Sequence, residues 1–242
     1  FIMKKQLLIV GLAGALIASS TIAFAGEEDT ENSPFSATLG FYSDYMFRGL
    51  SQTDNGIAIQ GSFDYANDNG FYAGVWGSNV DFKGDSDTSL EVDLYLGYAT
   101  EFNGVILDFA VLRYLYPDSN SLEDFNEYKV AATISGFTAS LYFTNDMFGT
   151  GENAWYVNGA YSFALAMDIS LDLAVGYSDY DKAVLNNGSA PDDYMDWSIG
   201  LSKSINGFGL SLQYIDSNSN SEKMYGDSIT DGRVVFSVSR SF

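Results

Sequence analysis

Residues 90–115 form the stretch LEVDLYLGYATEFNGVILDFAVLRYL. Apolar and polar side chains alternate on both sides of Asn103-Gly104, a dipeptide that is the strongest short-range signal for a two-residue β-hairpin turn. Such a turn fixes which residues of the two strands lie opposite each other. In that register Phe109 faces Tyr98 on an apolar side, while Asp108 falls on the other side. The stretch therefore predicts an antiparallel hairpin with one apolar and one polar face.

Two more dipeptides of this kind give the same result. Around Ser135-Gly136 the register places Val130 opposite Leu141 on an apolar face, and around Asn206-Gly207 one face is again apolar. A soluble β-sandwich shows the same alternation, with its apolar face turned inward. The connectors separate the two possibilities.

Connectors alternate strictly in length between twelve alternating stretches that run from Phe35 to Phe242. The short ones are Ala66 to Gly70, Asn103-Gly104, Ser135-Gly136, Ala164 to Met167, and Asn206-Gly207. The long ones are Leu50 to Gly56, Asp81 to Thr88, Pro117 to Asp124, Asp146 to Asn153, Tyr180 to Asp193 and Asp216 to Thr230. In outer-membrane barrels the short turns gather on one side of the bilayer and the long loops on the other. The pattern predicts an all-β, 12-stranded antiparallel transmembrane β-barrel with short periplasmic turns and long extracellular loops.

The beginning of the chain has the pattern of a secretory signal peptide. Met3-Lys4-Lys5 precedes an apolar run from Leu7 to Ala18, and Ala23-Phe24-Ala25 supplies small residues for cleavage before Gly26. We expect residues 1–25 to be a signal peptide with two extra N-terminal residues, 26–33 a short acidic segment, and 34–242 the barrel. This order predicts export through the periplasm of a Gram-negative bacterium.

The end of the chain supports the same compartment. Val234, Phe236, Val238 and Phe242 alternate along the last stretch, and they are predicted to face lipid and to direct assembly. Such an ending resembles the assembly signal of bacterial outer-membrane barrels, although Arg240 stands where an apolar residue is usual. Outer-membrane lipids and the barrel assembly machinery are therefore the expected partners.

Charge and missing residue types exclude several functions. With 32 acidic against 11 basic residues, the chain would repel nucleic acid. There is no cysteine and no histidine, so thiolate metal sites are excluded and the usual general base near neutral pH is absent. Asp192-Asp193 and Asp85-Ser86-Asp87 lack the fixed spacing of a calcium loop and are interpreted as ordinary loop acids. We expect no enzyme activity, no cofactor and no metal.

Composition fits a chain in which alternate residues face lipid. Hydrophobic residues make up 46% of the chain, yet the mean hydropathy is only -0.02. Many aromatic residues lie near predicted strand ends, where interfacial girdles form. These residues are Tyr42, Tyr45, Phe47, Tyr98, Phe102, Tyr116, Phe137, Tyr177 and Phe208.

The polar face predicts the lining of the lumen. The residues assigned to it are Asp44, Arg48, Gln60, Asp64, Trp76, Glu91, Asp93, Asp108, Tyr114, Glu127, Lys129, Asp172, Asp196, Gln213 and Arg233. Acids outnumber bases in this set, which favours cations over anions. Twelve tilted strands give a backbone diameter of about 24 Å, so a narrow passage is expected. The alternative is a closed barrel in which these groups pair with each other and with tyrosine hydroxyls.

A family resemblance rests on a motif in the first third of the chain. The motif comprises Ser43-Asp44-Tyr45, Phe47-Arg48-Gly49, Ser51-Gln52, Gln60-Gly61, Phe63-Asp64-Tyr65, Gly70-Phe71-Tyr72, Gly74, Trp76 and Ser78-Asn79-Val80-Asp81-Phe82. It closely resembles the opening of the bacterial TorF-type porins, and weaker similarity continues to Phe242. The resemblance implies an outer-membrane barrel without naming a solute. Its motif suggests a network of Arg48 with Asp44 or Asp64, as a pore constriction or a structural plug.

Two functions remain open from the sequence. The first is a porin-like channel for passive passage of small solutes or ions, narrow and cation-preferring. The second is a non-conducting barrel whose acidic loops bind a partner, a cation or a surface, which rests on the length of Tyr180 to Asp193 and Asp216 to Thr230. Neither implies a particular oligomeric state.

Overall fold

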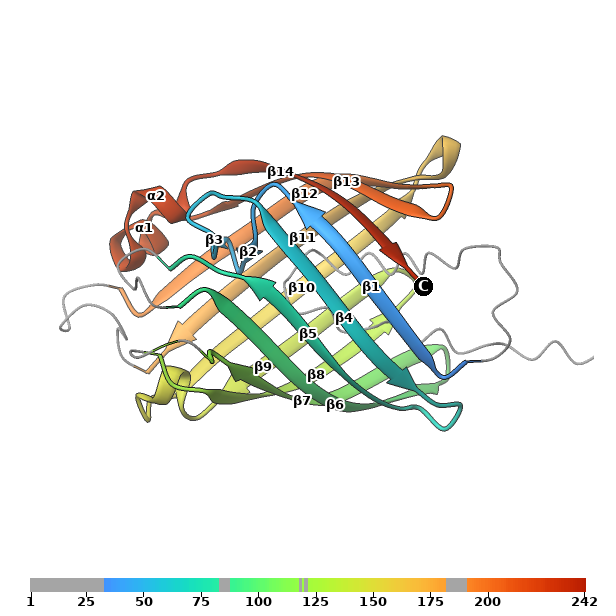
Figure 1. The fold of residues 1–242 in the computed structure, drawn as a ribbon, viewed down its shortest axis with the longest axis horizontal. Helices are drawn as coiled ribbons and strands as arrows, with labels where there is room; N and C mark the ends of the chain where they lie inside the picture. Colours follow the sequence, from blue (N-terminus) through green and yellow to red (C-terminus); the bar gives the residue numbers. More distant parts are fainter. Residues whose placement is uncertain (1–32, 83–87, 118, 120–121, 182–190) are drawn as a thin grey trace, which may run out of the picture.

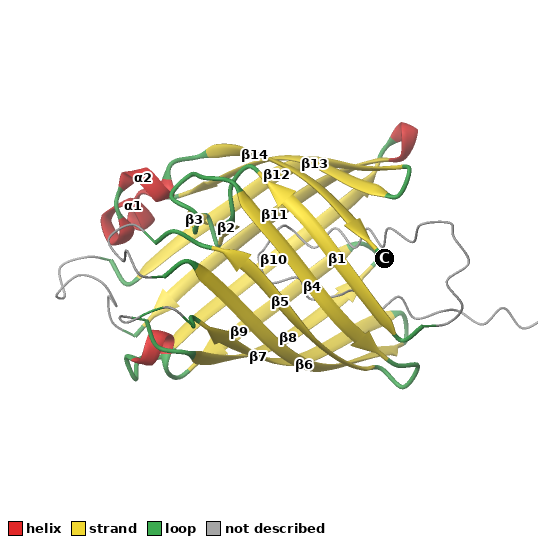
Figure 2. Ribbon diagram, viewed as in Figure 1, coloured by secondary structure: helices red, strands yellow, loops and turns green. Residues whose placement is uncertain are grey.

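A computed structural model of the chain describes residues 33–82, 88–117, 119, 122–181 and 191–242. In these residues twelve antiparallel strands close into one barrel (Figures 1 and 2). They are β1 (Phe35–Tyr42), β4 (Ala58–Ala66), β5 (Phe71–Asn79), β6 (Leu90–Phe102), β7 (Val105–Leu115), β8 (Phe125–Ile134), β9 (Phe137–Thr144), β10 (Ala154–Ala164), β11 (Ile169–Tyr180), β12 (Asp193–Ile205), β13 (Phe208–Ser217) and β14 (Arg233–Ser241). The predicted 12-stranded barrel is confirmed.

Each strand pairs with its neighbours in the chain, and β1 pairs with β14 to close the ring. The predicted signal peptide and all but the last residue of the acidic segment lie outside the described residues, as do Asp85-Ser86-Asp87. No helix in the described ranges is long and apolar enough to cross a membrane.

The registers deduced from the two-residue turns are the observed ones. Phe109 lies opposite Tyr98, and the pairs around the other two turns match the prediction as well. Asn103 and Gly104 have φ angles of 51° and 82°. This left-handed pair is the type I′ turn, whose twist matches that of the two flanking strands.

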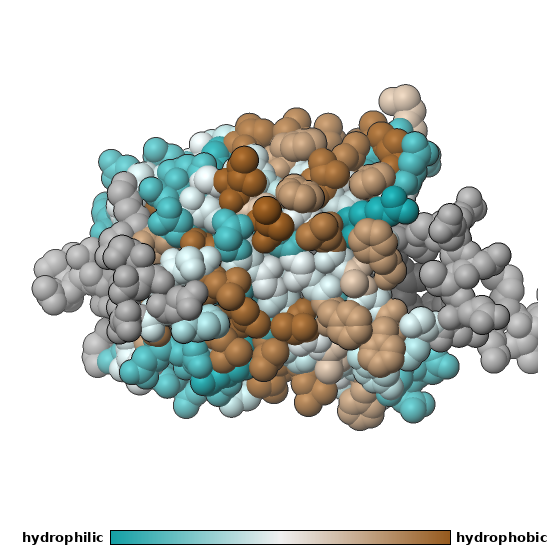
Figure 3. All heavy atoms as spheres, in the orientation of Figure 1, coloured by the Kyte–Doolittle hydropathy of each residue, from teal (hydrophilic) through white to brown (hydrophobic). Residues whose placement is uncertain are grey.

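The outer face of the barrel is apolar around its middle. Figure 3 shows a band of hydrophobic side chains between two hydrophilic ends. Leu96, Val234 and Phe236 are among the exposed apolar residues of this face. Arg240, near the end of the last strand, lies over the rings of Phe208 and Phe242, at 5.0 and 5.4 Å from their centroids. Arg240 stands where an apolar residue is usual, and these two aromatic rings stabilise its positive charge.

Two long connectors differ from the prediction. Strand β1 ends at Tyr42 instead of continuing to Gly49, and the next segment forms a two-stranded sheet of β2 (Met46–Phe47) and β3 (Leu50–Ser51). The last long connector contains two helices, α1 (Ser219–Tyr225) and α2 (Asp227–Thr230), which the sequence reading did not predict. Figure 1 shows both features at the end of the barrel opposite the C-terminus.

Some aromatic residues expected at the membrane interface lie inside the barrel. Tyr45 is 1% exposed and Tyr116 is 6% exposed, and both belong to the inner hydrophobic cluster. Tyr42 and Phe47 pack against the same cluster. The girdle assignment is wrong for these four. Tyr45 and Phe47 lie on the segment that turns into the lumen after β1, and Tyr42 and Tyr116 occupy inward positions, in β1 and directly after β7. By contrast, Phe102 is exposed on the surface.

Candidate functional site

A short hairpin, residues 44–53, crosses the lumen and is called the inner hairpin below. Its two strands, β2 and β3, are joined by Arg48 and Gly49, whose φ angles are 50° and 77°. A Cβ atom on Gly49 would lie 2.8 Å from the Cβ of Asp196 on β12. Only glycine permits this close approach together with the left-handed backbone, so the tip is fitted to the barrel wall.

Arg48 shows how far the inner hairpin reaches. In the ring order, β1 and β4 are neighbours, and β8 to β10 lie across the lumen from them. Arg48 Nη2 donates to Glu127 Oε1 on β8 at 2.7 Å. The same guanidinium lies over the rings of Tyr142 on β9 and Tyr156 on β10, at 5.4 and 4.4 Å from their centroids. The inner hairpin therefore spans the barrel from wall to wall.

The ion pair at the tip is excluded from water. The side chains of Arg48 and Glu127 are each 2% exposed, and Glu127 also accepts a hydrogen bond from the Tyr114 hydroxyl at 3.0 Å. Burial disfavours the charged form of Arg48, but Glu127 outweighs this effect and the pKa of Arg48 lies above its ordinary value. Removing one partner of such a pair costs about 3 to 5 kcal/mol, because the other charge stays buried.

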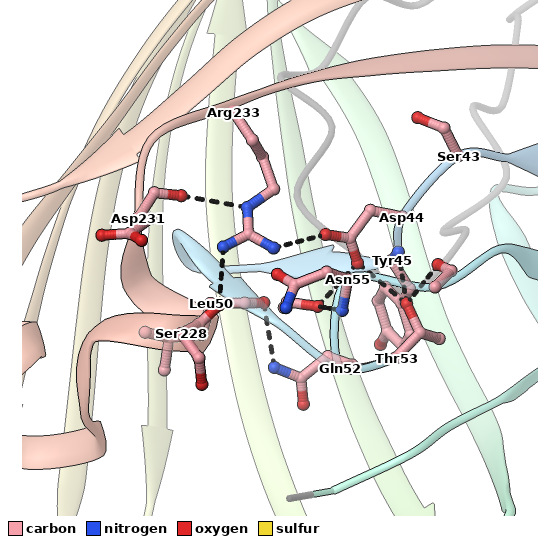
Figure 4. Close-up of polar contacts among 12 residues, drawn as sticks. Ser43, Asp44, Tyr45, Leu50, Gln52, Thr53, Asn55, Ser228, Asp231 and Arg233 are labelled. Atoms are coloured by element: carbon pink, nitrogen blue, oxygen red, sulfur yellow. Dashed lines mark hydrogen bonds and ion pairs between the residues drawn. The ribbon is translucent and has the colours of Figure 1, made fainter.

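Asp44 holds the base of the inner hairpin (Figure 4). Its Oδ1 accepts hydrogen bonds from Ser51 Oγ at 2.7 Å and from Thr53 Oγ1 at 2.8 Å. Its Oδ2 accepts from Arg233 Nη1 on β14 at 2.8 Å. One buried carboxylate thus joins both arms of the hairpin to the barrel wall.

Arg233 links this base to the helical loop. Its Nε donates to the carbonyl oxygen of Asp231 at 2.9 Å, and its Nη2 donates to that of Ser228 at 3.1 Å. Figure 4 shows the guanidinium between these carbonyls and Asp44. The planar fork of arginine therefore connects two segments far apart in the sequence.

The sides of the inner hairpin fill the space between the walls. Met46 forms a buried cluster with Ile215 of β13 and Val235 of β14. Tyr45 packs edge-on against Trp76 of β5, with 5.4 Å between ring centroids. Apolar contacts on two walls thus supplement the polar contacts at the tip and base.

Nearer the short turns, polar groups pair across the inner wall. Lys129 Nζ donates to Asp108 Oδ2 at 2.8 Å, and the Tyr72 hydroxyl donates to Asp108 Oδ1 at 2.7 Å. Asp172 accepts hydrogen bonds from Ser162 and Ser202 at 2.7 and 2.6 Å. The remaining acid of this group, Asp64, accepts hydrogen bonds from Tyr95 and Ser62.

The structure places the residues assigned to the lumen on the inner side of the barrel or in the inner hairpin. Gln60, Trp76, Glu91, Asp93, Tyr114, Glu127, Asp172, Asp196 and Gln213 are buried on inward faces, and Asp64, Asp108, Lys129 and Arg233 are half-buried there. Asp44 and Arg48 also lie inside the barrel. The sequence predicts them on the inward face of a first strand that continues to Gly49, whereas they lie on the inner hairpin. The role of all these residues in passage stays a prediction.

Sequence reasoning missed several residues of the site. The sequence places Ser51 and Thr53, which donate to Asp44, in the long connector Leu50 to Gly56 on the outside. Tyr142 and Tyr156, which stack on Arg48, were not singled out. The two tyrosines could have been found from the sequence, because both occupy inward positions in the alternation of β9 and β10.

Of the residues assigned to the lipid face, Val234, Phe236 and Phe242 are exposed on the outside. Val238 is half-buried and pairs with Phe41 and Leu210 on the same face. Within the described residues, no group of three or more acids could hold a metal ion.

Comparisons with known proteins agree with the fold. A family model described as "Bacterial protein of unknown function (Gcw_chp)" matches residues 27–242. No curated protein matches the sequence significantly. The solved NanC porin, in a rhombohedral crystal form, is similar with a TM-score of 0.53 and 10% identity, over 86% of this chain and 98% of that one. The KdgM porin gives a TM-score of 0.53 and 11% identity, over 86% of this chain and 99% of that one. At these identities the likeness shows the shared barrel fold.

Proposed function

The chain belongs to the Gcw_chp family of bacterial proteins of unknown function, and from this premise we propose that it is a narrow, cation-preferring channel of the bacterial outer membrane. It lets small solutes or ions pass passively and catalyses no reaction. The observation that carries the proposal is a closed cylinder with an apolar outer belt and a polar, acidic interior.

Location in the outer membrane follows from the outer belt and the ends of the chain. Exposed apolar side chains circle the barrel, and only a lipid environment makes such a surface favourable. The signal peptide in residues 1–25 sends the chain to the periplasm. The alternation that ends at Phe242 directs it to the assembly machinery. Structural neighbours called porins and the resemblance of Ser43 to Phe82 to TorF-type porins support this proposal.

Cation preference rests on the charges that face inward. Within the described residues each inward base is paired: Arg48 with Glu127, Lys129 with Asp108, and Arg233 with Asp44. The inward acids left without a basic partner in these residues are Asp64, Glu91, Asp93, Asp172 and Asp196. Their negative charge in a narrow, weakly screened tube attracts cations and repels anions.

Narrowness rests on the inner hairpin. Tyr45, Arg48 and Leu50 are all buried, so this segment occupies the middle of the lumen at the loop end. In the proposed channel the passage lies between the hairpin and the inner walls, where small polar residues such as Ser198 and Ser237 lie.

Recordings in planar bilayers test this function. Purified protein should give discrete conductance steps, and a KCl gradient should give a reversal potential of the sign for potassium over chloride. The preference should shrink in the Asp93→Asn, Asp108→Asn double variant, because two inward charges are lost. Asp216→Asn is the matched control, since its side chain is on the outer face beside Tyr214, and it should leave the reversal potential unchanged.

Absence of conductance would favour the second candidate function, a non-conducting barrel. Absence of any step above the empty-bilayer control, over several voltages and solutes, would reject the channel. It would favour a closed barrel whose acidic outer loops bind a partner, a cation or a surface. The buried network around Arg48 is the feature of the structure that fits this alternative.

A further inference from the structure

Asp93, on β6, is a buried acid without a partner. Asp93 is 1% exposed. In the described part of the chain, neither oxygen of its carboxylate has a hydrogen-bond partner. Asp44, Asp108 and Asp172, by contrast, each accept at least two hydrogen bonds. An ionised carboxylate out of water is costly unless a positive group compensates for it. Its surroundings show which kind of group would fit.

Acidic groups are concentrated around Asp93. Glu91 lies two residues away on the same face of β6 and is 3% exposed. Burial and the charges of Glu91 and Asp93 raise the pKa of both Tyr45 and Tyr116, so these phenols stay protonated beside the acids. Arg48, the base on the inner hairpin, is engaged by Glu127.

Aromatic rings complete the surroundings. Trp76 on β5 and Tyr114 on β7 are the cross-strand neighbours of Asp93 on its two sides. Tyr45 of the inner hairpin packs against Trp76 from the lumen side. Aromatic rings together with carboxylates attract monovalent cations and ammonium groups. Calcium takes six to eight oxygen ligands, and in the described residues no group of three or more acids could supply them.

We propose that Glu91 and Asp93 form a binding site for a small monovalent cation, either an alkali ion or the ammonium group of a small solute. The site lies on the β5–β7 wall, where Tyr45 of the inner hairpin covers it. This inference rests on the proposed channel, because the cation arrives through the lumen, and it names the class of solute that the lumen takes up.

Tryptophan fluorescence provides a direct readout of the site. The chain has three tryptophans: Trp155 and Trp197 are 40% and 41% exposed on the outside, and Trp76 is 2% exposed beside Asp93. In the Trp155→Phe, Trp197→Phe background, emission therefore reports on Trp76 alone. Detergent-solubilised protein is titrated with sodium, potassium or methylammonium chloride, and N-methyl-D-glucamine chloride keeps the ionic strength constant.

A saturable change in Trp76 emission is expected for at least one of these small cations. Asp93→Asn should weaken that binding by about tenfold or more, because a charge-assisted contact is lost. Asp216→Asn is the matched control, since it removes a carboxylate on the outer face of the barrel, and it should leave the titration unchanged. Glu91→Gln offers a second test if Asp93→Asn does not fold.

The outcomes separate the possible ligands and the two proposals. Saturation by methylammonium alone would indicate the ammonium group of a solute, and saturation by sodium or potassium alone would indicate a free ion. No saturation by any of the three, or equal titrations in wild type, Asp93→Asn and Glu91→Gln, would overturn the site. Cation binding without bilayer conductance would reject the channel and support the site. Conductance without cation binding would support the channel and reject the site.

Discussion

Arg233 carries the connection between the two loops that enter or cover the lumen. Each nitrogen of its guanidinium donates to a different acceptor: the carboxylate of Asp44 and the carbonyl oxygens of Ser228 and Asp231. A lysine has one ammonium on a flexible stem and cannot reach three acceptors in a plane. The inner hairpin and the helical loop are therefore coupled through one side chain.

Arg233→Lys should loosen the inner hairpin without removing the positive charge. Loss of two or more hydrogen bonds, one to a carboxylate, should lower the local stability of residues 44–53 by about 1 to 3 kcal/mol. Hydrogen exchange followed by mass spectrometry should show faster exchange in this segment. The control is Arg240→Lys, on the outer face over Phe208, which should not change it. Equal exchange in wild type and Arg233→Lys would contradict the coupling.

At the scale of strands, tyrosines of one strand lie over glycines of the next. Tyr72 on β5 is the cross-strand partner of Gly97 on β6, and a Cβ on Gly97 would lie 2.2 Å from Tyr72 Cζ. Gly74 and Tyr95 show the reverse arrangement, with 2.5 Å between a Cβ on the glycine and the ring. The absent side chain lets each ring lie flat on the inner wall, which directs the Tyr72 hydroxyl to Asp108.

Gly97→Ala should therefore destabilise the barrel. The added methyl displaces Tyr72 from β6 and breaks its hydrogen bond to Asp108, with an expected loss of about 1 to 3 kcal/mol for overpacking. Thermal unfolding in detergent, followed by circular dichroism, measures the difference. Gly159→Ala is the control, because a Cβ there would meet only the ring of Phe137 at an ordinary 3.9 Å. A Gly97→Ala melting temperature no lower than that of Gly159→Ala would refute this packing account.

Strand registers could be predicted from the sequence because two-residue turns determine them locally. The inner hairpin could not, since the alternation continues past Tyr42 and gives no sign that the chain leaves the wall. Contacts with β8, β9 and β10, distant in sequence, decide its position. Helix α1 had readable signals: Asn218 caps its first turn by accepting from the Asn220 amide, and Gly226 follows its end.

Parity also explains what could be predicted of the lumen. On regular strands an inward position follows from the period of two, so Glu127 and Asp172 were placed correctly on the inner face. Parity does not say which acids find partners. Asp172 meets two serines, whereas Asp93 meets aromatic rings, and this difference depends on neighbouring strands and on the inner hairpin.

At the scale of the whole molecule, a cylinder with an apolar belt encloses a lumen that its own first loop crosses. In the proposed channel, the inner hairpin restricts passage. Its middle can be removed cleanly, because the Gln52 amide donates to the Tyr45 carbonyl at 2.7 Å and a two-residue turn can join these ends. Replacing residues 46–51 by Asn-Gly, with Glu127→Gln to avoid an unpaired buried charge, gives a shortened variant.

Single-channel conductance in planar bilayers should be compared between this shortened variant and the wild-type protein, since the variant lacks both members of the Arg48–Glu127 pair and keeps the same net charge in the lumen. The restriction predicts larger current steps for the shortened variant under the same salt and voltage, because the segment that spans the lumen is gone. Current steps of equal size in the two proteins would contradict it.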